Sequence, residues 1–372
     1  MGSTRKQPIT FRKEELEAIA RCWSGATSAA LVGIGSVGKS NLLQHLDDLE
    51  VQKHYLGDRA AKFKTIIVDA NMLGPLPADK DDPVRCWAGY ELMMHRLFLA
   101  FYPFEMLSNE EAKQFFDTYQ ALQDGNNPLF TYMALRYFEL GLEYFMRKGY
   151  TIAFMFDEFD EMLRQLPVKF FQTLRGMRDS NKRQLLYITL TRSPLVTLVE
   201  RFDIPLLDIE PFTELFTDNT IYVGPYNDVD GRAMLAELSR RRQRNYSDYV
   251  NGLLLDVTGR YAGILRASVN SLDEFVNVNL NALSRGELLA LLAVKPSVRA
   301  ECRTIWSSLN RSEQMVLKAV ARLSAYNVNT ESELAVHMLL QKGILRLDNS
   351  GQRLEILPPV FHEFVQSNPD TV

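Results

Sequence analysis

The sequence predicts an α/β fold, in which a five-stranded, mainly parallel sheet is followed by a helical region and a segment with a hairpin. Three observations support this prediction. Apolar, β-branched runs alternate with amphipathic helical stretches through residues 1–210. Helical periodicity continues through 211–298. In 299–372, two short apolar runs flank the turn-forming residues 348–351, with helical patterns on both sides. We therefore expect three domains with these boundaries.

Length and composition are those of a soluble globular protein. The chain of 372 residues can form two or three packed domains, and 46% of its residues are hydrophobic and 24% charged. A net charge of −4 gives no global reason to expect nucleic acid or an acidic membrane as partner. No apolar run approaches the roughly 18 residues of a membrane span, and the N-terminus is polar and basic. We expect a cytoplasmic protein without a membrane partner.

The three cysteines are Cys22, Cys86 and Cys302. They are widely separated and odd in number, which is typical of reduced residues in a cytosolic protein. No cysteine or histidine lies at metal-ligand spacing. We therefore expect no metal site built from these residues.

The first elements follow from apolar spacing. Phe11, Leu16, Ile19 and Trp23 recur at helical spacing, and the run 29–32 is apolar. Prolines among a cluster of aspartates indicate a loop before residue 90. In order, we expect a short lead-in and a helix within 9–24, a strand over 28–34, a helix over 41–46, a charged connector over 52–62, a strand over 64–70 and a loop over 71–90.

Amphipathic helices and three further strands complete the first domain. Leucines and aromatic residues recur at helical spacing between 87 and 148, whereas the runs that follow are short and apolar. The helical insert could also form a partner surface. We expect helices over 87–101, 108–123 and 128–148, and strands over 150–156, 184–190 and 204–209.

A glycine-rich segment, Gly33-Ile34-Gly35-Ser36-Val37-Gly38-Lys39-Ser40, separates the first strand from the helix after it. This GxxxxGKS pattern between strand and helix is typical of a P-loop, whose backbone N–H groups wrap a polyphosphate. Lys39 can reach the β- and γ-phosphates and Ser40 can ligate Mg²⁺. The alternative is a glycine-rich turn without a ligand. The predicted residues for binding ATP or ADP are Gly33, Gly35, Ser36, Val37, Gly38, Lys39, Ser40 and Asn41.

The third strand ends in Asp157-Glu158. Ligands bind at the carboxyl edge of open α/β sheets, where both side chains should lie. We expect Asp157 to hold Mg²⁺ and Glu158 to polarise the water that attacks the γ-phosphate. Asp160 and Glu161 continue the acidic run, but carboxylates facing solvent at a helix N-terminus explain them more simply.

The fourth strand ends in Thr191-Arg192. A polar side chain at this tip can bind the γ-phosphate or the attacking water, and a cation such as Arg192 can complement the extra charge of a triphosphate. Only such differential contacts shift a conformational equilibrium. The alternative is a surface arginine at a strand end.

Together these motifs identify a family resemblance. The lead-in Phe11-Arg12-Lys13-Glu14-Glu15-Leu16, the Asp157-Glu158 strand and the Thr191-Arg192 tip resemble the STAND ATPases and AAA+ relatives of the origin-recognition type. The resemblance implies a P-loop ATPase core, a lead-in that covers adenine and ribose, and a turn into a helical lid at Pro211-Phe212.

In the predicted lid, Thr258-Gly259-Arg260-Tyr261-Ala262-Gly263-Ile264-Leu265-Arg266 resembles the Gly-Gly-His-Pro-Gly-Leu-Leu-Arg segment that opens a lid helix near the nucleotide. Arg260 and Ala262 replace the family's second glycine and its proline. Arg266 matches the arginine that AAA+ enzymes use as a second phosphate sensor. The alternative is a solvated helix arginine.

The C-terminal segment resembles a winged helix. Helices near 300–309, 312–324 and 330 onward precede a hairpin over 343–357 and a last helix from Pro358-Pro359. A DNA reader normally shows a basic footprint, yet this segment holds eight Lys or Arg and eight Asp or Glu. The basic cluster Arg240-Arg241-Arg242-Gln243-Arg244 could touch nucleic acid or a neighbouring subunit, or could favour a helix C-terminus.

Two functions fit these patterns. The first is a slowly hydrolysing, ATP-dependent switch that controls the lid and winged helix, with other protein subunits or self-assembly as its output. The second is a DNA-associated AAA+ ATPase for replication initiation or transposition control, which binds duplex through the winged helix and the arginine cluster. A kinase fits poorly, because Asp157 and Glu158 suit water activation.

Overall fold

A computed structural model describes residues 7–73, 82–124, 128–275, 278–323, 329–348, 350–351 and 353–367. They form two compact units. The first comprises the residues up to Leu31 together with Ser40–Ile221. The second comprises Val32–Lys39 together with the residues from Tyr222 onward. The division of the chain at residues 210 and 298 stays a prediction.

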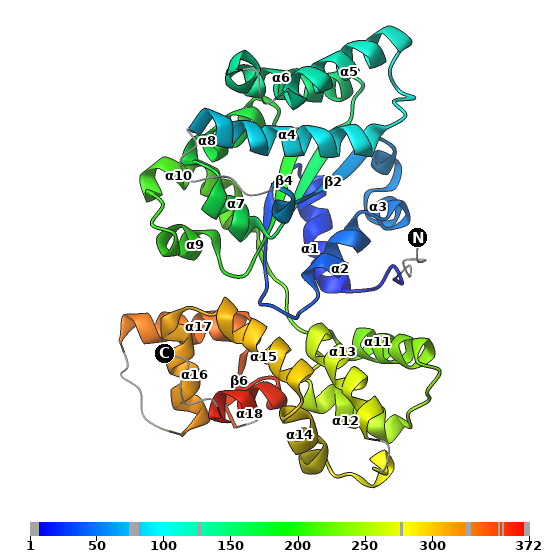
Figure 1. The fold of residues 1–372 in the computed structure, drawn as a ribbon, viewed down its shortest axis with the longest axis vertical. Coiled ribbons are helices and arrows are strands. Elements are labelled where there is room, and N and C mark those ends of the chain that lie inside the picture. The colour runs from blue at the N-terminus through cyan, green and yellow to red at the C-terminus, as the bar shows by residue number, and fades with distance from the viewer. Residues whose placement is uncertain are drawn as a thin grey trace. The chain divides into compact units, whose positions relative to one another are not determined.

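A five-stranded sheet confirms the predicted α/β fold class (Figure 1). Its strand order is β2-β3-β4-β1-β5, and the β2–β3 and β3–β4 pairs are parallel. In register, Asp69 lies beside Asp157, and Phe156 lies beside Thr189. Parallel strands bring their carboxyl ends to one edge, so β2, β3 and β4 end on the same side of the sheet. The strands are β1 (Ala29–Val32), β2 (Phe63–Asp69), β3 (Thr151–Asp157), β4 (Leu185–Thr191) and β5 (Thr220–Tyr222).

The predicted fifth strand over 204–209 is wrong, because this segment enters helix α10 (Leu206–Thr213). Pro205 precedes the helix, and Ile209 and Phe212 are both fully buried. Their separation by three residues fits one helix face and not the alternation of a strand. The chain therefore does not turn at Pro211-Phe212 as predicted, since both lie inside α10, and the fifth strand follows as β5.

Two segments predicted to lack regular structure contain helices. The charged connector over 52–62 is wrong, because α3 (Leu49–Leu56) and the 3₁₀ helix η1 (Gly57–Lys62) occupy it. Asp48 caps α3 by accepting from the Glu50 N–H at 2.8 Å, and Val51 and Leu56 are buried beneath its charged face. The predicted loop over 71–90 ends early, because α4 begins at Asp82. Residues 74–81 lie outside the described residues.

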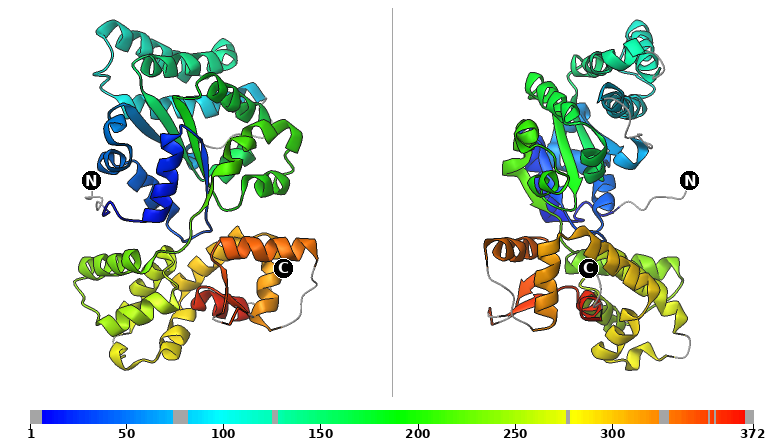
Figure 2. Two further views of the ribbon diagram at one scale, coloured as in Figure 1. Left: turned by 180° about the vertical axis from the view of Figure 1, so that it is seen from behind. Right: turned by 60° about the vertical axis from the view of Figure 1, so that its left-hand side comes forward.

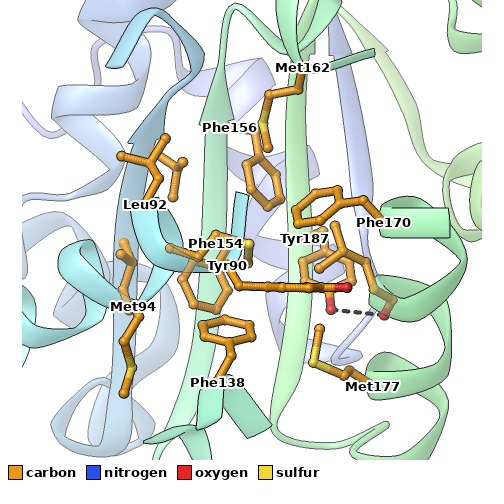
Figure 3. Packing of buried hydrophobic residues seen from close by; sticks show 14 of the residues in the cluster. Tyr90, Leu92, Met94, Phe138, Phe154, Phe156, Met162, Phe170, Met177 and Tyr187 are labelled. Carbon is orange, nitrogen blue, oxygen red and sulfur yellow. Dashed lines mark hydrogen bonds between the residues drawn. The ribbon is translucent and has the colours of Figure 1, made fainter. Parts of the chain in front are cut away.

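Helices lie on both sides of the sheet (Figure 2). Aromatic side chains dominate the core, where Phe154, Phe156 and Tyr187 project from the strands toward Tyr90 of α4 and Phe170 of α8 (Figure 3). Their burial supplies the main driving force for packing this unit. The other helices of the first unit are α1 (Lys13–Ser24), α2 (Lys39–Leu46), α4 (Asp82–Phe101), α5 (Asn109–Gln123), α6 (Pro128–Met146), α7 (Phe159–Gln165), α8 (Val168–Ser180), α9 (Leu195–Arg201) and the 3₁₀ helices η2 (Ala70–Leu73) and η3 (Glu214–Asn219).

The second unit is mainly helical, with a small hairpin near its end. The ion pair between Glu313 and Lys342 joins the start of one helix to the end of another at 2.5 Å, and each side chain is only 1% exposed. The elements are α11 (Asp228–Arg241), α12 (Asp248–Val257), α13 (Ala262–Ser271), η4 (Leu272–Glu274), η5 (Leu280–Ala282), α14 (Arg285–Ala293), α15 (Pro296–Ser308), α16 (Arg311–Ala321), α17 (Thr330–Gln341), β6 (Leu345–Leu347), β7 (Leu354–Ile356) and α18 (Pro359–Ser367).

The hairpin is antiparallel, with Arg346 beside Glu355, and a helix follows it as predicted. The helix predicted from residue 330 begins there, and Asn329 caps it, because the Asn329 side chain accepts from the Ser332 N–H at 2.9 Å. None of the helices in the described residues is both long enough and apolar enough to cross a lipid bilayer.

Candidate nucleotide-binding site

The glycine-rich segment forms a loop between the end of β1 and the start of α2. Lys39, the first residue of α2, turns its ammonium group back over this loop. Its Nζ donates to the Gly33 carbonyl at 2.6 Å and to the Ile34 carbonyl at 3.2 Å. Lysine presents three N–H donors on a long stem, so the same group can serve phosphate oxygens.

The loop conformation explains its residue types. Gly38 has a φ of +91°, and a Cβ there would lie 3.0 Å from the Tyr226 hydroxyl. Ser36 has a φ of +68°, in the left-handed region that side chains rarely adopt. Such strain concentrates at ligand-binding sites. A Cβ on Gly33 would lie 2.9 Å from the Val223 carbonyl oxygen, so the backbone could not approach as closely with any other residue.

Residues from the second unit hold the loop, which belongs to that unit. The Gly263 N–H donates to the Ser36 carbonyl at 2.8 Å, and the Ser36 hydroxyl donates to the Glu301 carboxylate. Arg266 of α13 lies 3.7 Å from Glu301, with 61% of its side chain exposed. The segment predicted to open a helix near the loop does so, because α13 begins at Ala262.

At the other predicted motif, Asp157 is the last residue of β3 and Glu158 directly precedes α7. Glu158 has a φ of +50°, and its N–H donates to the Asp157 carboxylate at 3.0 Å. This left-handed step turns the chain sharply between strand and helix. Both acids, like Ser40, Asn41 and Arg192, belong to the first unit.

The structure brings Arg192 directly onto Glu158. The guanidinium lies 2.7 Å from the carboxylate, with the side chains 40% and 31% exposed. The Arg192 N–H also donates to Asp160 at 3.3 Å. Asp160 therefore contacts the end of β4. The sequence alone explained Asp160 as a solvent-facing acid at a helix N-terminus and did not predict this contact. A hydrogen bond from Arg164 lowers the pKa of the neighbouring Glu161 carboxyl.

Two further residues lie at this edge: Asp69 was not predicted from the sequence, whereas Thr191 belongs to the strand tip that was predicted to bind the γ-phosphate or the attacking water. Asp69 ends β2 beside Asp157, although neighbouring strands are only about 4.8 Å apart and the acids would repel each other. Thr191 ends β4 fully buried, and its hydroxyl has no hydrogen-bond partner among the described residues. A buried polar group without a partner is costly, which marks this hydroxyl as available to a ligand. The sequence signal that could have identified Asp69 is the Asp at the end of the second strand, which parallels Asp157 at the end of the third.

The available side chains suit a Mg²⁺ ion that is bound partly by the substrate better than a Mg²⁺ ion that is bound by protein ligands alone. Mg²⁺ keeps several waters and uses one or two carboxylates plus substrate phosphates. Among the described residues, no three His, Cys, Asp or Glu side chains gather to hold a metal. Asp157 presents carboxylate oxygens at the end of β3, and Ser40 and Asn41 are exposed in the first turn of α2.

The cysteines are free and buried. Burial raises the pKa of all three thiols, of Cys86 to about 11 and of Cys302 to about 12. Because the thiolate is the metal ligand and the nucleophile, such thiols are inert at neutral pH.

The predicted lead-in and the basic cluster both make contacts within their own compact units. Phe11 of the lead-in is buried against the ring of His45, and Arg12 pairs with Glu15 at 2.6 Å. In the basic cluster, Arg240 and Arg241 pair with Glu237, and Arg242 and Arg244 pair with Asp273. These acids neutralise most of the cluster's charge.

Comparison with solved structures gives the fold's relatives. The chain is similar to the Walker-type ATPase of Pyrococcus abyssi, with a TM-score of 0.54, 15% identity and 95% of each chain covered. It is also similar to the ORC2 protein of Aeropyrum pernix, with a TM-score of 0.52, 15% identity, and 99% of this chain and 97% of that chain covered. At such identities the likeness shows a shared fold.

No protein-family model and no curated protein sequence matches the chain.

Proposed function

We propose that this protein binds and slowly hydrolyses ATP, and that its nucleotide state controls the second unit. One observation carries the proposal: a GxxxxGKS loop follows the first strand of the sheet, and β3 of the same sheet ends in Asp157. A phosphate-binding loop after one strand and an acidic end on another strand suit the hydrolysis of a nucleoside triphosphate. The Aeropyrum pernix ORC2 protein, which shares the fold, was solved in ADPNP–ADP complexes.

The residues divide the chemical work. The N–H groups of the loop and the Lys39 ammonium bind phosphate oxygens, and Ser40 and Asp157 would hold Mg²⁺. A bound Mg²⁺ would neutralise the charge that develops on the phosphates. Glu158 takes the proton of the attacking water, and Arg192 stabilises the charge of the γ-phosphate.

The Glu158–Arg192 pair supports slow turnover. The Arg192 guanidinium lies 2.7 Å from the Glu158 carboxylate and therefore occupies the group that would accept the proton of the attacking water. Productive hydrolysis then requires Arg192 to leave Glu158, and a γ-phosphate would attract it. The same arginine would thereby distinguish ATP from ADP.

The charges in the second unit favour a protein-facing output. If 299–372 is a winged helix, α17 occupies the place of its recognition helix. That helix carries Glu331 and Glu333 and neither Lys nor Arg. Its carboxylates would repel DNA phosphates. We therefore propose that other subunits or a second copy of the chain receive the signal.

The first test is steady-state ATP hydrolysis at low salt, with and without duplex DNA. A slow rate that DNA does not change, and that Lys39→Ala abolishes, is the expected result. Stimulation by DNA that fades as salt rises would favour the DNA-associated alternative. An equal rate in the Lys39→Ala protein would show that this loop is not the site.

A further inference from the structure

The carboxylate of Glu301 lies on the loop that we propose to bind phosphate. Glu301 belongs to α15, far from the loop in sequence but in the same compact unit. It accepts a hydrogen bond from the Ser36 hydroxyl. Ser36 is the residue that holds a left-handed φ of +68°. A side chain of the second unit therefore fixes the loop at its strained position.

Two neighbouring contacts show that Glu301 is closely fitted. A Cβ on Gly263 would collide with the Glu301 carboxylate and lie 2.8 Å from the Ser36 Cβ. A Cβ on Gly35 would collide with the side chain of Thr304, which lies three residues after Glu301 on α15. Thus α15 approaches the loop at two places, and glycines make room for both.

Arg266 lies on the other side of Glu301, at 3.7 Å. It is the residue whose position resembles a phosphate-sensing arginine. While its partner is Glu301, its charge is partly satisfied by a carboxylate of the protein itself. An anion on the loop could replace that carboxylate as the partner of Arg266.

We propose that Glu301 is a displaceable internal anion, which holds α15 on the loop and competes with the phosphates of ATP. This inference rests on the proposed function. Like charges in one site repel, so a polyphosphate and the Glu301 carboxylate disfavour each other. By linkage, nucleotide binding must weaken the contact between Ser36 and Glu301 as much as that contact weakens nucleotide binding.

The position of Glu301 connects the loop to the C-terminal core. The next residue, Cys302, is buried, and Trp306 on the same helix packs on Phe361 of α18 with ring centroids 6.5 Å apart. Releasing Glu301 therefore frees a helix that forms part of this core. The contact can turn phosphate binding into a rearrangement of α15 and α18.

The test measures the affinity for ATP with Mg²⁺ by isothermal titration calorimetry. Glu301→Gln removes the charge but keeps the shape, and Glu301→Ala is a second variant in case Gln retains the hydrogen bond. Glu355→Gln is the matched control, because Glu355 pairs with Arg346 at 2.8 Å on the hairpin and is remote from the loop in sequence. Thermal unfolding checks that all three proteins are folded.

We expect Glu301→Gln to bind ATP at least about fivefold more tightly than wild type, the lower end of typical coupling between sites. Glu355→Gln should bind as wild type does. If wild type binds ATP and neither Glu301 variant binds more tightly, the proposal about Glu301 is wrong and the proposed function stands. If no variant binds ATP, both are wrong.

Discussion

The glycine-rich loop and the acidic strand ends are held by different kinds of contacts. In the loop, most contacts involve main-chain groups: the Lys39 ammonium donates to two carbonyls and the Gly263 N–H donates to the Ser36 carbonyl, and the Ser36 hydroxyl adds one side-chain contact, to Glu301. At the strand ends, side-chain charges dominate, with Arg192 on Glu158. Main-chain contacts depend on shape, whereas charge pairs can exchange partners. We infer that the loop determines binding and that the strand ends determine turnover.

The sharpest test of this division is Glu158→Gln. Loss of a general base should lower turnover by about 10²–10⁴-fold while leaving ATP affinity nearly unchanged. Single-turnover hydrolysis and calorimetry measure the two quantities. Glu161→Gln, in the first turn of the helix that follows Glu158 and paired with Arg164 at 2.6 Å, is the control and should hydrolyse normally. Turnover of Glu158→Gln at the wild-type rate would remove Glu158 from its role.

Arg192→Ala should lower turnover by about 10²-fold, the effect of losing one donor that stabilises transition-state charge. Its effect on stability should be small, about 0–1 kcal/mol, because both members of the pair are partly exposed. The amount of phosphate released at fixed times measures the rate of ATP turnover. Arg164→Ala, at a similar exposed pair, is the control. Faster hydrolysis by Arg192→Ala would mean that Arg192 only restrains Glu158.

Gly38→Ala tests the loop through its shape. Placing a side chain at a φ of +91° costs about 1–2 kcal/mol, so ATP affinity should fall by about tenfold if the loop relaxes to another conformation. Calorimetry measures it. Gly252→Ala is the control, because it lies within α12 with nothing within 4 Å of the new Cβ and should be slightly stabilising. Unchanged affinity in Gly38→Ala would mean that the loop tolerates other shapes.

The smallest expected effect is that of Asp69→Asn. Asp69 lies beside Asp157 but already accepts from the Asn71 N–H and side chain, each at 3.0 Å. Removing its charge should raise the Mg²⁺ concentration for half-maximal hydrolysis by no more than about tenfold. A Mg²⁺ titration of the rate measures this. Complete loss of activity would place Asp69 among the direct ligands.

Local patterns predicted the fold class and four of the five strands, because buried strands are continuous apolar runs. The same rule failed at 204–209, where a short apolar run after Pro205 is helical. Periodicity cannot separate a buried strand from a helix over so few residues. Helix α3 was missed for a similar reason, because half of its eight residues are polar or charged and its few buried side chains give too short a periodic pattern.

The motifs of the candidate site could be located from spacing alone, but their partners could not. The Gly33–Ser40 pattern and the Asp157-Glu158 pair are contiguous in sequence. Glu301 contacts Ser36 across 265 positions, and Arg192 contacts Glu158 across 34. No local propensity encodes such pairs, since they arise from the packing of separate elements. Asp69 was visible as a strand end, but only the register places it beside Asp157.

The buried pair of Glu313 and Lys342 has a consequence for how this chain can evolve. With each side chain 1% exposed, losing one member leaves the other charge without compensation, at a cost of about 3–5 kcal/mol. That is a large part of the stability of a typical domain. Replacing both by apolar residues of similar volume is often neutral. In related chains, positions 313 and 342 should therefore change together. A chain in which only one of the two has changed should fold only if its stability exceeds what folding requires.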